Sequence, residues 1–168
     1  MLIEKHISDL LYRYQCVTVP GFGAFLTETV SAHVTGSASS FFPPKKVVSF
    51  NANVKNNDGL LANHVALQEK MSYELALIKI GDVVNEWTYL LQNRNRVVLK
   101  NIGEISVNNE MNWVFEPANT VNYLTDSFGL TPFVSPEITR EVLKQEVEAL
   151  EEKAPIIFTP ERKKDYSY

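Results

Sequence analysis

The sequence predicts an α+β protein made of two related units, each combining helices with a small antiparallel sheet that carries a β-hairpin arm. Three observations predict this. Apolar residues recur at helical spacing in several segments, β-branched and aromatic runs flank short glycine turns, and one pattern occurs twice. A length of 168 residues suits one medium domain or two small ones. We expect units at residues 1–60 and 60–132, then a charged helix and tail at residues 133–168.

The first unit is expected to begin with a helix and continue as a hairpin. Apolar spacing predicts an amphipathic helix over Ile3–Gln15, and Cys16–Thr29 is typical of a strand with a turn at Pro20–Gly23. A polar stretch at residues 33–40 then predicts a long hairpin extension. The return strand is expected at Val47–Phe50.

The second unit is expected to contain two helices before its strands. Asp58 is placed to cap a helix from about Leu60 to Lys70. Ser72 is a good N-cap for a longer helix from Tyr73 to Gln92. The expected buried stripe of that helix consists of Leu77, Ile80, Val84, Trp87 and Leu91.

Strands and a short last helix complete the second unit. Strand character occurs within Arg96–Val107 and again at Trp113–Pro117, and a polar hairpin with the sequence NNEMN joins the two segments. Asn119–Leu130 is expected to form a short helix that ends at Gly129.

A charged helix is expected after Pro132. Ser135 is its predicted cap, and Pro136 occupies the first helical position. Such a helix either docks on the preceding domain or meets a partner helix, and docking is the favoured interpretation. Its narrow apolar seam consists of Ile138, Val142, Leu143, Val147 and Leu150.

The internal repeat relates the two hairpins. The segment VPGFGAF at residues 19–25 aligns with LKNIGEI at residues 99–105, and Phe50 aligns with Phe115. The first copy therefore has a long hairpin where the second has a tight turn. In GFGAF the glycines lead into a strand rather than a helix N-terminus, so a bend or bulge is predicted instead of a phosphate-binding loop.

This order of motifs resembles the HU/IHF fold of bacterial DNA-bending proteins. The likeness is carried by MSYELALIKIGDVVNEWTYLLQNRNRVVLKNIGEISV, in which a serine-capped helix leads to a strand and a glycine turn, and by FEPANTVNYLTDSFGL in the second unit. The segments CVTVPGFGAFLT, FFPPKKVVSFNANVKNNDGLLANHVA and NYLTDSFGLTPF further resemble a divergent tandem HU-like module at the N-terminus of bacterial SPOR-domain, peptidoglycan-binding proteins.

The resemblance implies a place in the cell. In such proteins a membrane-spanning helix and a periplasmic SPOR domain follow the module, so it implies a cytoplasmic segment at the inner face of the cytoplasmic membrane. Membrane contact is expected only through a span further downstream. The motif PERKKDYSY near the end would then be a basic cytoplasmic flank, although an ordinary solvated tail fits it equally well.

Charge argues against strong DNA binding. The net charge is −4, and the regional balances are +1 for residues 1–70 (6 basic, 5 acidic), −3 for residues 71–132 (4 and 7) and −2 for residues 133–168 (6 and 8). Phosphate neutralisation supplies most non-specific DNA affinity, and the cations around the first hairpin would engage only about three phosphates. The candidate contacts for a protein partner or nucleic acid are Phe41, Phe42, Pro43, Pro44, Lys45, Lys46 and Lys55.

The PPKK motif within this set has a simpler explanation as an edge segment, where proline and lysine discourage strand pairing. A protein-docking arm anchored by Phe41 and Phe42 is the alternative that we keep beside it.

No motif indicates catalysis, a metal or a cofactor. The three histidines are scattered and lack ligand spacing, and no nucleophile motif is present. A single cysteine, Cys16, excludes an intramolecular disulfide and is expected to be a small core residue. The predicted function is a non-catalytic interaction module that binds a protein partner or itself. The alternative is an HU/IHF-type DNA-binding protein of reduced affinity.

Overall fold

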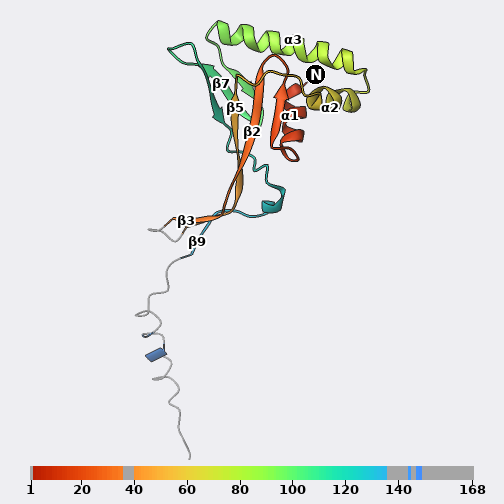
Figure 1. Ribbon diagram of the computed structural model, residues 1–168. Helices are drawn as coiled ribbons and strands as arrows, with labels where there is room; N and C mark the ends of the chain where they lie inside the picture. Colours follow the sequence, from red (N-terminus) through yellow and green to blue (C-terminus); the bar gives the residue numbers. More distant parts are fainter. Residues whose placement is uncertain (1, 36–39, 136–143, 145–146, 149–168) are drawn as a thin grey trace, which may run out of the picture.

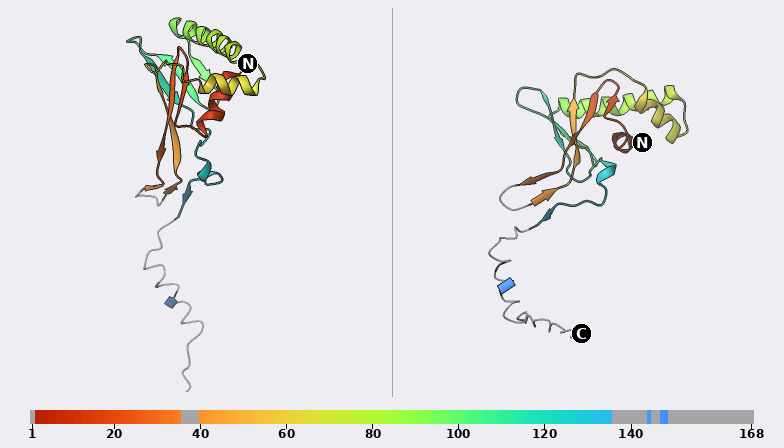
Figure 2. Two further views of the ribbon diagram at one scale, coloured as in Figure 1. Left: turned by 45° about the vertical axis from the view of Figure 1, so that its right-hand side comes forward. Right: turned by 60° about the horizontal axis from the view of Figure 1, so that its bottom comes forward.

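The computed structural model describes residues 2–35, 40–135, 144 and 147–148. It is an α+β structure, as predicted, with three α-helices and short antiparallel sheets among these residues. Figure 1 shows a head in which α3 lies along one end, and a narrow extension that leaves the opposite end of the head. The other views in Figure 2 show the same extension.

The first unit contributes one helix and one three-stranded sheet. Helix α1 spans Ile3–Leu11, and the sheet has the order β1-β2-β5, formed by Cys16–Val19, Gly23–Val30 and Lys45–Asn51. The predicted helix extended to Gln15 and was too long. The chain must turn after Leu11 to enter β1.

The second unit contributes two helices and the matching sheet. Helix α2 spans Leu60–Gln68 and helix α3 spans Tyr73–Gln92. The Oγ atom of Ser72 accepts the Leu75 N–H at 3.3 Å, which confirms the predicted N-cap. Asp58 accepts the Leu60 N–H at 3.0 Å, but Gly59 is the N-cap residue. The second sheet has the order β6-β7-β8, formed by Val97–Leu99, Gly103–Val107 and Trp113–Pro117.

The pairing registers confirm the internal repeat. In the first sheet Val19 pairs with Gly23 and Phe25 pairs with Phe50. In the second sheet the equivalent pairs are Leu99 with Gly103 and Ile105 with Phe115. The strands of the two units therefore align residue by residue through the first hairpin turn.

One hydrophobic core joins the units. Helix α1 buries Ile3, Ile7, Leu10 and Leu11, and α3 buries Ala76, Ile80, Val84, Trp87 and Leu91 against the same cluster. Aromatic rings connect the two sheets: Phe22 lies 5.1 Å from both Trp87 and Trp113, and Phe25 lies 5.8 Å from Phe115 between ring centroids.

The predicted helix at Asn119–Leu130 is wrong. The structure has only a 3₁₀ turn, η1, at Thr125–Ser127. Tertiary contacts outweigh helix propensity here because Tyr123 is buried and its hydroxyl donates to the Asn101 carbonyl at 3.0 Å. Burial is also the main cause that raises the pKa of Tyr123, while a hydrogen bond with Ser8 opposes the rise.

Residues 118–132, which we call the strap, instead run along the first hairpin to its far end. There β9, Phe133–Val134, joins β3, His33–Thr35, and β4, Ser40–Phe42, in a third sheet of order β3-β4-β9. The sequence did not predict this sheet. Figure 1 shows β3 and β9 together, well away from α3, below the head.

Two other predictions have partial outcomes. Cys16 is only half-buried at the start of β1, so it is not a full core residue. The predicted C-terminal helix falls mostly outside the described residues; its described residues 144 and 147–148 are helical, and Val147 is 51% exposed.

Candidate functional site on the hairpin arm

The first hairpin extends beyond the head as a narrow arm. We define the arm as residues 28–35, 40–47 and 133–134, which comprise β3, β4, β9 and the adjoining parts of β2 and β5. Six of the seven predicted contact residues, 41–46, lie on it. Lys55 lies elsewhere, in the segment between β5 and α2.

Aromatic side chains stack across the strands of the arm. Phe41 stacks on Phe133 with 4.8 Å between centroids and an interplanar angle of 6°. Phe42 stacks on His33 at 5.0 Å and 10°. Because adjacent residues of a strand point to opposite faces, these two pairs cover opposite faces of the arm.

The arm exposes much of this apolar surface. Val34 is 55% exposed and Phe133 is 59% exposed. A hollow of about 570 Å³ lies between β3, β4 and the end of the strap, and it is lined by Ala32, His33, Val34, Phe41, Phe42, Pro43, Pro44, Gly129, Leu130, Thr131 and Phe133.

The two prolines connect β4 to β5 and are held by the strap. The Asn122 side chain donates to the Pro44 carbonyl at 3.0 Å and accepts the Lys46 backbone N–H at 3.1 Å. This asparagine therefore fixes the start of β5 from outside the hairpin. A further hollow of about 440 Å³ is lined by residues of β5, such as Val47, and by residues of the strap, such as Asn122.

Two of the three predicted cations are engaged by the protein itself. The Lys46 ammonium donates to the Leu11 carbonyl at 3.4 Å and to the Tyr12 carbonyl at 3.2 Å, so it caps the C-terminus of α1. Lys55 lies over the Trp113 ring, 5.6 Å from its centroid. Lys45 is the first residue of β5 and is exposed.

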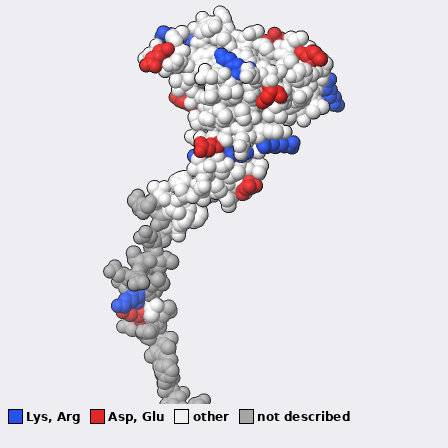
Figure 3. Space-filling model, in the orientation of Figure 1, with Lys and Arg blue, Asp and Glu red and all other residues white. Residues whose placement is uncertain are grey.

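The charged residues of the arm, Glu28, Lys45 and Lys46, all lie at its base. The 16 residues from Thr29 to Pro44 contain no Lys, Arg, Asp or Glu. In Figure 3 cationic and anionic side chains are interspersed over the visible face of the head, and the white lower part of the extension, above the grey atoms, shows neither. This face shows no continuous cationic groove.

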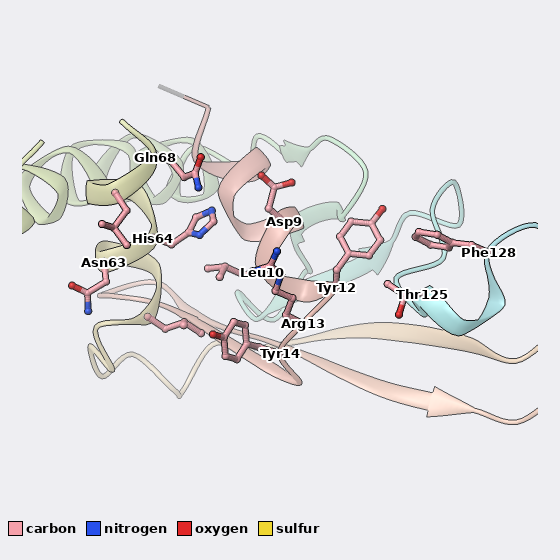
Figure 4. Close-up of a pocket in the computed structure, with 12 residues that line it drawn as sticks. Asp9, Leu10, Tyr12, Arg13, Tyr14, Asn63, His64, Gln68, Thr125 and Phe128 are labelled. Atoms are coloured by element: carbon pink, nitrogen blue, oxygen red, sulfur yellow. The ribbon is translucent and has the colours of Figure 1, made fainter. Parts of the chain in front are cut away.

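A third hollow, of about 910 Å³, lies between α1, α2 and η1, as shown in Figure 4. The His6 and His64 rings meet edge to face near it at 5.5 Å, and His6 Nε2 lies 3.2 Å from the Glu69 carboxylate. Burial, and then the neighbouring His6, lowers the pKa of His64. Among the residues that the structure describes, no group of His, Cys, Asp and Glu is arranged to hold a metal ion.

Three residues that the sequence reasoning did not single out belong to the arm: Val34, Phe133 and Val134. An available signal was the apolar pair in TPFVSP, enclosed by Pro132 and Pro136, which marks a short extended segment. In the described part of the chain no helix is long and apolar enough to cross a bilayer.

The fold and the repeat define the class of protein. Two copies of a three-stranded sheet with a helix-capped core and hairpin arms form a tandem HU-like architecture. Family models agree: CCDC81-like prokaryotic HU domain 1 matches residues 1–58, and CCDC81-like prokaryotic HU domain 2 matches residues 59–128. The chain therefore belongs to this family and carries its two HU domains in tandem. No curated protein and no solved structure matched it.

Proposed function

We propose that this tandem HU-type module acts as a non-catalytic scaffold whose arm binds a protein partner. HU-like domains are typically architectural or binding modules, which makes a binding role the first expectation for this chain. The single observation that carries the proposal is the neutral aromatic arm. It offers stacked rings and an apolar hollow where a DNA-binding arm would need cations.

Photo-crosslinking tests which molecule the arm meets. Benzoylphenylalanine placed at Phe42 should give a covalent adduct with a protein in cells of the source organism. The matched control is the same residue at Tyr89, an exposed position of α3. Equal adduct yields at the two positions, or none at Phe42, would contradict the proposal.

DNA binding is the competing function, and titration tests it directly. A labelled duplex should show no binding below about 100 μM protein at physiological salt, because the arm neutralises so few phosphates. Micromolar or tighter binding that weakens steeply with salt would reverse the conclusion in favour of DNA.

We further propose that the module is the cytoplasmic N-terminal part of an envelope-anchored SPOR-domain protein. Its support is the resemblance of residues 1–130 to that arrangement and the adjacent cations Arg162, Lys163 and Lys164, which fit a cytoplasmic flank. The coding sequence beyond Tyr168 tests it. An apolar span followed by a SPOR domain is expected, and a stop codon at that point would refute it.

A further inference from the structure

The edge strand β3 has the features of a pairing surface. The sheet order β3-β4-β9 places β3 at the edge of its sheet in the described part of the chain. An edge strand presents unpaired N–H and C=O groups, and proteins usually protect such edges with charges, prolines or bulges. Strand β3 consists of His33, Val34 and Thr35, all exposed, and it contains no Lys, Arg, Asp or Glu.

Another edge strand, β6, is protected against pairing by flanking charges. Strand β6 also has three residues, and its central Val98 is 72% exposed. It is flanked by Arg96 and Lys100, however, so a second copy approaching this edge would meet like charges. Strand β3 has no such flanks because the charge-free segment extends from Thr29 to Pro44.

An apolar row crosses the arm and ends at this unprotected edge. Val34 pairs directly with Phe41, and Phe41 pairs directly with Phe133. Directly opposed residues of an antiparallel sheet share a face, so these three side chains form one continuous row. The row ends at the two edge strands of the sheet, at Phe133 on β9 and at Val34 on β3. The β9 segment lies between Pro132 and Pro136, and prolines of this kind discourage pairing at an edge, whereas β3 has no neighbouring proline.

We propose that β3 pairs antiparallel with β3 of a second copy of this chain, with the two-fold axis at Val34. The proposal rests on the proposed function of the arm and names its partner. In this register Val34 faces Val34 of the second copy, and the apolar row continues from three residues to six across a six-stranded sheet. The absence of charged residues between Thr29 and Pro44 favours this occupant, because two copies meet there without like-charge repulsion.

Sedimentation velocity of the full chain measures the pairing. The wild-type protein should show a monomer–dimer equilibrium below about 100 μM, and Val34→Lys should weaken dimerisation by about tenfold or more because it places two lysines face to face. The matched control, Val98→Lys, puts the same change in the centre of the other exposed edge strand and should leave the equilibrium unchanged.

Cysteine crosslinking checks the register. Under a mild oxidant Val34→Cys should form a disulfide-linked dimer, because the two-fold axis brings its β-carbons together. Thr35→Cys should crosslink less, because Thr35 would face His33 of the second copy, and the wild-type chain reports the background from Cys16.

A monomeric wild type, or a dimer that survives Val34→Lys, would overturn the proposal. Failure of the self-pairing can be told apart from failure of the proposed function. A monomer whose arm still crosslinks to a different protein refutes only the self-pairing, whereas a DNA-bound arm refutes the proposed function itself.

Discussion

The hairpins of the two units differ far more than the sheets that carry them. In the second unit β7 and β8 are joined by residues 108–112, where the Asn108 carboxamide oxygen accepts the backbone N–H groups of Glu110 and Asn112. In the first unit β2 and β5 continue beyond the head and lead into the arm. Burial constrains the strands within the head, whereas a hairpin outside it is free to change length and chemistry.

The sheets share a packing detail as well as a register. A Cβ atom built on Gly23 would lie 2.6 Å from Cε2 of Phe50, and one built on Gly103 would lie 2.6 Å from Cε2 of Phe115. In both units a phenylalanine of the third strand covers a glycine of the second. The two units have thus kept the same close approach of ring to backbone, although their arms have diverged.

The largest loss in the free energy of unfolding is expected from Phe22→Ala. Phe22 is completely buried and contacts Trp87 and Trp113, which belong to the second unit. Removing a buried phenylalanine typically costs about 3–5 kcal/mol. Thermal or urea unfolding followed by tryptophan fluorescence and circular dichroism should show one destabilised transition, because both units share a core.

The repeat position Ile102 provides the comparison for this variant. Ile102→Ala should cost about 2–5 kcal/mol, and it should also preserve a single transition because Ile102 belongs to the same cluster. Two separate transitions in either variant would show that the units unfold independently, contrary to a shared core.

The second largest loss of stability is expected from replacing the two equivalent glycines, Gly23 and Gly103. Gly23→Ala and Gly103→Ala should each destabilise the protein by about 1–3 kcal/mol, because the added methyl group overlaps a ring and a backbone carbonyl. Chemical denaturation of both variants measures how equivalent the two sites are.

Gly81→Ala is the matched control for the glycine series. Gly81 lies within α3, and a Cβ atom there would meet nothing within 4 Å. Alanine is favoured over glycine in a helix interior by roughly 1 kcal/mol, so this variant should be stabilised. A Gly23→Ala protein as stable as the wild type would mean that both the Phe50 ring and the Asn51 carbonyl move aside at little cost.

The sequence was most informative where local signals and burial agree. The Ser72 cap, the long helix after it and the repeat of Gly23 in Gly103 follow from spacing and residue type alone. The segment at Asn119–Leu130 was misassigned because its contacts are long-range. Asn122 bonds to Pro44, which is 78 residues away in the chain, and no local pattern encodes such a partner.

In the candidate site, too, features set by local sequence could be predicted and features set by long-range contacts could not. The aromatic pair at residues 41–42 is visible as a motif. The stacking partner of Phe42, His33, follows from the register of the hairpin itself, but the partner of Phe41, Phe133, lies on a strand at the far end of the strap. Lys46 shows that the contacts of a charged side chain could not be predicted from the sequence. A lysine beside prolines at a hairpin gives no sequence signal that its ammonium faces the end of α1.

Lys46→Met should cost about 1 kcal/mol, because two carbonyls at the C-terminus of α1 lose a charged donor. The neighbouring Lys45→Met is the control, and it should change the free energy of unfolding by less than about 0.5 kcal/mol because Lys45 is exposed. Equal effects of the two changes in urea denaturation would show that the capping contact contributes nothing to stability.

The smallest expected effect is a pH dependence at the contact between α1 and α2. His64 has its pKa lowered from the ordinary value of 6.5 by burial, then by His6, with Arg13 adding to the shift and Asp9 opposing it. As the pH falls below 6.5, the unfolded chain therefore takes up the proton before the folded chain does. The contribution of His64 to the melting temperature should therefore be constant well above pH 6.5, and the melting temperature should fall as the pH drops below this value. His64→Gln should flatten this fall, whereas His33→Gln, on the exposed arm, should retain it. If both variants keep the full decrease, then the charge that opposes folding at low pH lies outside this helix contact.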